Sequence, residues 1–256
     1  MIKRILPVVA RLAVLGLLAA CTTPTPSKVP TPTNTPTPTN SAAPTPSTAP
    51  GTAGGAAHLT SGGTRLVGTG TVQTAPIRPG RTQTVLVGIT TLAGSGSAPV
   101  PSLTGGGVRW TRLDFVTEIR NGAVGPRLLT LYASSGVGSG PLTISVPPLR
   151  KQELSWSVVQ AKGSVVQMGT TGEPLAGPPA QVSLPNPPTG TVVSFFLVGT
   201  SSTIKAVAPA TKLGQGDTPS FPSSTSTEVS DAQAVQLMWT VDGPGHYLGL
   251  IVEMSV

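Results

Sequence analysis

From residue 57 onward, apolar and polar side chains alternate with a period of two in many short runs. In Leu154-Ser-Trp156-Ser-Val158, the apolar residues are separated by serines. A period of two places successive side chains on opposite faces of a strand, so Leu154, Trp156 and Val158 share one face. Clusters of Gly, Pro and Ser separate the runs, and no long stretch has helical periodicity. This pattern predicts an all-β fold with antiparallel sheets.

The runs define the strands that we expect and the faces that they bury. Trp156 and Trp239 both fall in the apolar phase of their runs, which predicts that both rings pack in the core. Trp110 shares its phase with Val108 and is also expected to pack. The expected strands are 64–73, 82–91, 108–117, 127–133, 142–146, 154–161, 180–184, 191–198, 204–208, 234–241 and 246–254.

Two halves of this region are loosely alike. Residues 84–89 match residues 193–199 in residue type, and a turn of Gly, Ser or Thr follows each. The likeness fits two small sandwiches or one sandwich whose strands divide between two sheets. We favour a single antiparallel β-sandwich over residues 57–256, of jelly-roll or immunoglobulin-like type, because residues 170–179 form only a short connection.

The first 20 residues have the layout of a secretory signal peptide. Lys3 and Arg4 give a positive start, an apolar segment follows, and Ala19 and Ala20 end it. The uninterrupted apolar run at 12–20 is far shorter than the roughly 20 residues of a spanning helix. The segment therefore predicts export rather than a permanent transmembrane anchor.

The only cysteine of the chain closes this segment, in Leu18-Ala19-Ala20-Cys21. These residues resemble the lipobox of bacterial lipoproteins. The resemblance implies cleavage before Cys21, lipid on its sulfur and a membrane as partner through that lipid. It places the protein on the extracytoplasmic face of the cell membrane. Thr22 is not the Asp of an inner-membrane retention signal, which implies the outer membrane if the host has one.

Residues 21–56 form a Pro/Thr-rich tether behind the lipidated cysteine. Nine prolines occur between Thr22 and Pro50, and large apolar side chains are almost absent. Such a segment cannot bury a core, so we expect it to be disordered or polyproline-like.

The positive charge is concentrated ahead of the expected domain. The whole chain has a formal net charge of +7, but residues 57–256 carry 12 Lys plus Arg against 9 Asp plus Glu, a net of +3. These residues include no basic cluster, which argues against nucleic acid as a partner.

The sequence offers no convincing catalytic or metal site. Asp242 and His246 could share one turn, and Asp114 and Glu118 could share a strand face. The simpler interpretation is a polar turn for the first pair and solvated charge on a strand or loop for the second. No Gly-x-Ser-x-Gly elbow, phosphate loop or zinc spacing occurs. We therefore expect no enzyme activity, no catalytic residues, no metal and no cofactor.

At residues 104–113 a glycine turn enters a Trp strand, and residues 248–254 form a closing apolar strand. These segments resemble jelly-roll-like sandwich domains of secreted bacterial and phage surface proteins. The resemblance implies a binding, adhesion or envelope structural module. It carries no functional residue over to this chain.

An exposed ligand patch is the remaining expectation. Tyr132 and Tyr247 fall in the outward phase of their strands, and Arg109 and Arg127 lie nearby in sequence. Exposed aromatic rings beside polar groups suit carbohydrate, so an envelope glycan or protein is the expected partner. A carbohydrate-binding module and an extracytoplasmic hydrolase with an atypical site are the alternatives.

Overall fold

A computed structural model describes most of the chain after residue 56. The described residues are 57–66, 70–94, 96–118, 125–148, 152–175, 180–199, 203–218, 223–230, 235–241 and 245–256. All of these described residues belong to one compact unit. All secondary structure within the described ranges is β-strand, and the expected all-β antiparallel fold is confirmed.

The strands fall into two consecutive sets of eight. The first set is β1 (Ala57–Leu66), β2 (Thr71–Gln73), β3 (Gln83–Ala93), β4 (Ser102–Gly105), β5 (Arg109–Glu118), β6 (Arg127–Ser135), β7 (Leu142–Ser145) and β8 (Gln152–Lys162). The second set is β9 (Ser164–Leu175), β10 (Ala180–Ser183), β11 (Thr191–Val198), β12 (Ile204–Ala206), β13 (Thr211–Thr218), β14 (Ser223–Ser230), β15 (Gln236–Val241) and β16 (Gly245–Ser255).

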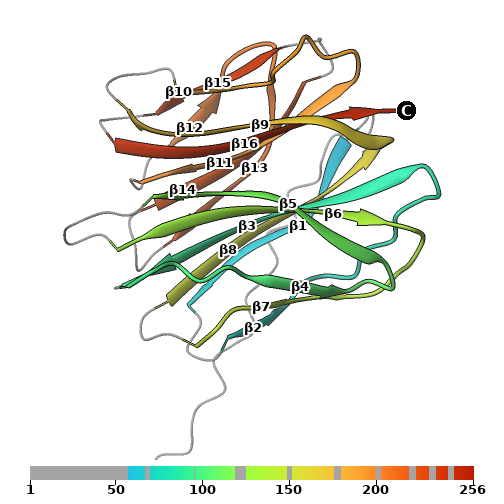
Figure 1. Ribbon diagram of the computed structural model, residues 1–256, viewed down its shortest axis with the longest axis horizontal. Helices are drawn as coiled ribbons and strands as arrows, with labels where there is room; N and C mark the ends of the chain where they lie inside the picture. Colours follow the sequence, from blue (N-terminus) through green and yellow to red (C-terminus); the bar gives the residue numbers. More distant parts are fainter. Residues whose placement is uncertain are drawn as a thin grey trace, which may run out of the picture. The chain divides into compact units, whose positions relative to one another are not determined.

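These strands build four sheets in layers (Figure 1). The first set forms a three-stranded sheet, β2-β7-β4, and a five-stranded sheet, β1-β8-β3-β6-β5. The second set forms a five-stranded sheet, β9-β16-β11-β14-β13, and a three-stranded sheet, β10-β15-β12. The two five-stranded sheets face each other, and one three-stranded sheet covers each of them on the other side.

The two halves have the same topology. Adding eight to each strand number of the first half gives the strand order of the second half in both sheets. Each half pairs its first strand with its eighth, its second with its seventh and its third with its sixth. Eight strands in two sheets are the content of a jelly roll. Of the two interpretations that the sequence leaves open, this strand order matches two sandwiches within one compact unit.

The repeat extends to an irregularity within single strands. The pairing of β5 with β6 shifts between Arg112 and Asp114, and that of β13 with β14 shifts between Lys212 and Gly214. Each shift is a β-bulge at a leucine, Leu113 or Leu213, that packs against the core shared by the two five-stranded sheets. The two halves therefore match residue by residue across this strand.

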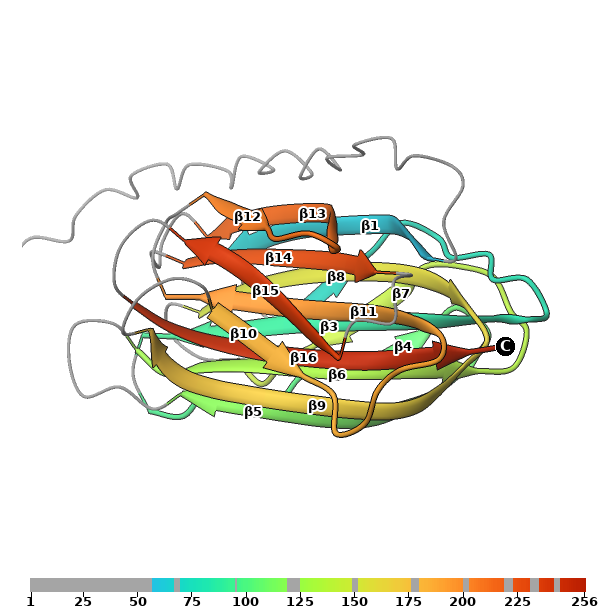
Figure 2. The same ribbon diagram turned by 90° about the horizontal axis from the view of Figure 1, so that it is seen from above.

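A shared apolar core joins the halves. Leu86 and Leu131 contribute from the first half, and Phe195, Leu250 and Val252 contribute from the second. Gly88 of β3 lies directly under the Phe195 ring, where a Cβ atom would stand only 2.2 Å from Cδ1. Figure 2 shows β1 running beside β13 and β5 running beside β9.

Each three-stranded sheet encloses a core of its own. Trp156 packs under β2-β7-β4 with Ile89 and Leu142, and Trp239 packs under β10-β15-β12. The Trp239 ring stacks on Phe196 with centroids 4.1 Å apart. Trp156 and Trp239 are 6% and 0% exposed, so the expectation that both are core residues is confirmed.

Candidate functional site

The outer face of β5 carries the most exposed aromatic group in the described residues. Trp110, Arg112 and Phe115 pair in register with Ser134, Tyr132 and Thr130 of β6. Those three partners alternate along β6 and so lie on one face of the sheet. Trp110, Arg112 and Phe115 therefore lie on one face as well, and we call them the β5 row.

The bulge at Leu113 creates this row. Without it, Asp114 would follow Arg112 on the outer face by simple alternation. The extra residue shifts the phase, so that Phe115 takes this place and Leu113 turns into the core between the five-stranded sheets. The Asp114 carboxylate accepts a hydrogen bond from the Phe115 backbone N–H at 2.8 Å, which fixes the strand just after the bulge.

Arg112 and Phe115 form a cation–π pair. The guanidinium carbon of Arg112 lies 5.3 Å from the centroid of the Phe115 ring. Phe115 is 41% exposed and Arg112 is exposed, so the pair contributes only about 0.5–1 kcal/mol. One face of the ring and most of the guanidinium donors therefore stay available to solvent.

Trp110 anchors the other end of the row. Its indole N–H donates to the Gly105 carbonyl at 3.0 Å, and its ring packs partly against the core under β2-β7-β4. The side chain is half-buried, so part of the ring still reaches solvent. The expected packing role is confirmed, but the sequence does not show that the ring is also at the surface.

The three-stranded sheet β2-β7-β4 covers the outer face of β6 but not that of β5. Tyr132, the cross-strand partner of Arg112, is 7% exposed, and its hydroxyl donates to the Pro101 carbonyl at the start of β4. Burial raises the pKa of Tyr132, and the positive charge of Arg112 lowers it to a smaller extent. β5 thus forms an uncovered margin of its sheet beside the buried strand β6.

The second half shows how the same position looks without such a row. By register, Lys212 corresponds to Arg112 and Gln215 corresponds to Phe115. The Lys212 ammonium donates to the Ile204 carbonyl at 2.9 Å and to Gln215 Oε1 at 3.1 Å. The polar groups of the second half are thus used within the fold, whereas Arg112 makes no hydrogen bond or ion pair within the described residues.

The predicted ligand patch is not found at the surface. Tyr132, Tyr247 and Arg127 are 7%, 5% and 1% exposed, and only Arg109 is an exposed side chain. Tyr247 packs beside Phe196 with ring centroids 5.4 Å apart, and Arg127 donates to the Gly199 carbonyl. The expectation of one exposed patch is corrected, because Tyr132, Arg127 and Tyr247 lie on β6 and β16, which are covered on both faces.

Phe115 is the residue that sequence reasoning missed. Its run, 108–117, was recognised, but alternation from Trp110 assigns Phe115 to the opposite face. Only the bulge reverses this assignment, and no Gly or Pro marks the bulge in the sequence. The only hint in the sequence is that Trp110, Arg112 and Phe115 occur together in one edge strand.

One buried carboxyl group stands out in the second half. Glu228 of β14 is 0% exposed, and burial raises its pKa to about 8. Ser226, Trp239 and Lys212 lower the pKa by smaller amounts, with the Ser226 hydroxyl 3.4 Å away. Because it corresponds to buried Tyr132 in the repeat, Glu228 fills a core position rather than an open site.

The two acids of β5 that were weighed as a catalytic pair lie too far apart for that role. Asp114 and Glu118 are four residues apart on β5, or about 13 Å at strand spacing. A glycosidase pair needs about 5–9.5 Å. His246 is half-buried at the start of β16, and Asp242 lies outside the described residues. No cluster of three potential metal ligands occurs within the described ranges.

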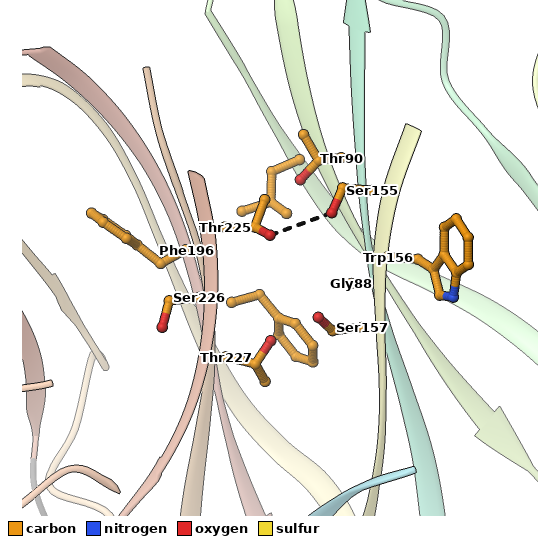
Figure 3. A pocket seen from close by; sticks show the side chains of 11 residues that line it. Gly88, Thr90, Ser155, Trp156, Ser157, Phe196, Thr225, Ser226 and Thr227 are labelled. Atoms are coloured by element: carbon orange, nitrogen blue, oxygen red, sulfur yellow. Dashed lines mark hydrogen bonds between the residues drawn. The ribbon is translucent and has the colours of Figure 1, made fainter. Parts of the chain in front are cut away.

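A small void lined partly by hydroxyl groups lies between the two five-stranded sheets (Figure 3). The hydroxyls of Thr90, Ser157 and Thr227 point into it, and the Ser155 and Thr225 hydroxyls meet there at 3.3 Å. Its volume of about 10 Å³ suits roughly one water molecule. This void is too small for a substrate.

Leu18, Ala19, Ala20 and Cys21 lie outside the described residues, as does the Pro/Thr-rich segment up to residue 56. In the part of the chain that is described, no helix is long and apolar enough to span a membrane.

No family model, no curated protein and no solved structure matches the chain.

Proposed function

We propose that this protein is a lipid-anchored, extracytoplasmic binding module that works without catalysis. The lipobox residues supply the anchor, and the β5 row supplies the contact surface. The observation that carries the proposal is the contrast between the halves. The same fold position is closed by hydrogen bonds at Lys212 but is open at Arg112 and Phe115. The fold does not require an exposed Phe there, so a contact outside the molecule accounts for it.

The anchor is tested by fractionating cells that express the full chain. The wild-type protein should appear in the membrane fraction with a lipid-modified amino-terminal Cys21, detected by mass spectrometry of its first peptide. Cys21→Ala should be exported but recovered in the soluble fraction, because the thioether to lipid cannot form. An unmodified Cys21 on the membrane-bound protein would contradict the anchor.

The contact surface is tested with the same unlipidated chain, Cys21→Ala, mixed with washed cell envelopes and sedimented. Phe115→Ala in this background should reduce the sedimented fraction at least tenfold, since the ring leaves the surface without affecting a core. Val235→Ala is the matched control, because Val235 is an exposed apolar side chain (38%) in the second half. Equal sedimentation of the Phe115 and Val235 variants would refute a binding role for the row.

A purely structural role in the envelope is the second candidate. The outer face of β2-β7-β4 is polar and carries no aromatic side chain. Cross-strand rows place hydroxyl and amide groups side by side on this face, from Thr71, Gln73, Ser102, Thr104, Thr143 and Ser145. A polar face of this kind suits a spacer, and the structural role predicts no loss of envelope binding in Phe115→Ala.

A further inference from the structure

The chemistry of the β5 row narrows the class of ligand, given the binding role proposed above. An exposed ring face beside a charged donor suits a molecule with both apolar and anionic parts. The Phe115 ring is 41% exposed and the Trp110 ring is half-buried, so both present flat apolar surface. Sugar rings present C–H groups on their faces, and these bury well against aromatic rings.

The spacing of the rings indicates a chain rather than a single sugar. Trp110 and Phe115 pair with Ser134 and Thr130, four residues apart on β6. The two residues are therefore about 13 Å apart along the strand. This separation is longer than one sugar ring, so one ligand that reaches both rings must contain several sugar units.

Arg112 lies between the two rings and selects for negative charge. Its guanidinium carries a planar fork of donors that matches a carboxylate. It makes no hydrogen bond or ion pair within the described residues, and its only contact of note is the cation–π pair with Phe115. Arg109 is also exposed, but it pairs with Ser135 and so lies on the opposite face of β5 from the row.

Asp114, the acid next to Arg112 in the sequence, does not lie on the outer face. Asp114 pairs with Leu131, whose side chain lies in the core between the five-stranded sheets, so Asp114 belongs to the opposite face of β5. Its carboxylate is also engaged by the Phe115 backbone N–H. The outer face is thus net positive, which complements an anionic ligand.

We propose that the β5 row binds an anionic saccharide chain, with sugar faces stacked on Phe115 and Trp110 and a carboxylate of the chain held by Arg112. The neighbouring β4 supplies exposed hydroxyls at Ser102 and Thr104 within the adjacent sheet. A row with a single arginine is too small for a nucleic acid, which needs a broad basic surface.

The test is a calorimetric titration of the unlipidated Cys21→Ala chain with saccharide probes of defined charge. The acidic probes are hexamers of galacturonate and oligosaccharides of hyaluronan, which carry a carboxylate on each uronate. The matched neutral probe is the methyl ester of the galacturonate hexamer. We expect at least tenfold tighter binding of an acidic probe than of the ester.

Variants then assign the contacts. Phe115→Ala should weaken binding of the acidic and ester probes alike, by about tenfold. Arg112→Gln should remove the preference for acid over ester while leaving ester binding nearly unchanged. Val235→Ala should bind as wild type does. Melting curves of all variants verify folding, and the melting temperature should change by no more than a few degrees, because the exposed Arg112–Phe115 pair contributes little to stability.

The outcomes separate this inference from the function on which it rests. Failure of every acidic probe to bind, or equal binding of acid and ester, overturns the anionic saccharide as ligand. If envelope sedimentation still depends on Phe115 in that case, the binding role survives with a different ligand. If neither measurement depends on Phe115, both proposals fail.

Discussion

Glu228 illustrates how one side chain can make the stability of this protein depend on pH. Its carboxyl group is buried, and its pKa rises from 4.5 to about 8, chiefly through burial. The folded state therefore favours the neutral form. The stability that this group contributes is complete below about pH 4.5 and is lost as the pH rises toward 8.

We expect Glu228→Gln to remove most of this pH dependence. Each unit of pKa shift corresponds to about 1.4 kcal/mol, so the variant should be more stable than wild type at pH 9 by a few kcal/mol. Urea unfolding at pH 5, 7 and 9 measures the difference. A variant less stable than wild type at pH 9 would show that the buried carboxylate is well satisfied.

Glu253 provides a control of opposite sign. A hydrogen bond from Gln167 lowers the pKa of Glu253, with further hydrogen bonds from the Thr189 and Gly190 backbone. Its contribution is present above its ordinary pKa and is lost as the pH falls. Glu253→Gln should therefore lower the free energy of unfolding at pH 7, and its difference from the wild-type protein should shrink at acidic pH. This is the reverse of the behaviour expected for Glu228→Gln.

At the residue scale, the sequence predicts the core better than the surface. Trp156 and Trp239 are buried as their alternation predicts. Tyr132 and Tyr247 also alternate correctly, but the opposite face of their strands is buried as well. Alternation identifies which side chains share a face, yet it cannot tell whether a further sheet covers the second face. In a fold of several stacked sheets, side chains that alternation assigns to the outer face can pack in a second core.

At the scale of the strand, the sequence misses strands that lack apolar alternation. Runs at 191–198 and 142–146 agree closely with β11 and β7. β9, β13 and most of β1 were not expected, and each is an edge strand rich in Gly, Ser or Thr. Such strands bury few side chains, so they lack the apolar alternation that makes a strand visible in sequence.

β14 was missed for a different reason, because it is an inner strand. Its side chains toward the first half are Thr225 and Thr227, which line the polar void with Ser155. The Thr225 hydroxyl also donates to the Gly216 carbonyl of β13 at 3.1 Å. Hydroxyl pairing between sheets replaces apolar packing here, and it leaves no apolar pattern in the sequence.

This hydroxyl pairing can be measured with a double-mutant cycle. Thr225→Val keeps the shape of the side chain but leaves the Gly216 carbonyl and the Ser155 hydroxyl without this partner, so we expect a loss of about 1–3 kcal/mol. Adding Ser155→Ala to this variant should lower the free energy of unfolding by less than Ser155→Ala does alone. The reason is that the substitution removes a Ser155 hydroxyl that has already lost Thr225 as a partner. Strictly additive losses in urea unfolding would indicate that the two hydroxyls do not interact.

At the scale of the whole described unit, the two halves should unfold together. Their common core contains side chains of both five-stranded sheets, with Phe195 seated over Gly88. Phe195→Ala should cost about 3–5 kcal/mol and leave a cavity between the sheets. Hydrogen exchange should then accelerate in β3 and β6 of the first half as well as in β11 and β16. Acceleration confined to β9–β16 would mean that the halves are independent.

Val235→Ala serves as the control for this measurement too, because Val235 is exposed and far from the shared core in the fold. Its hydrogen exchange should match that of the wild-type protein throughout the two large sheets.

The matching bulges at Leu113 and Leu213 have a consequence for valency. The protein carries two structurally equivalent margins, but only one bears an aromatic row. Changing Ala210→Trp, Lys212→Arg and Gln215→Phe would copy the row onto β13. If the row binds a long chain, this variant should gain affinity through avidity for polymeric saccharide and none for a short oligomer. One half of the repeat thus keeps a closed margin, while the other half is free to adapt to a ligand. A protein with one contact surface could acquire a second by three substitutions.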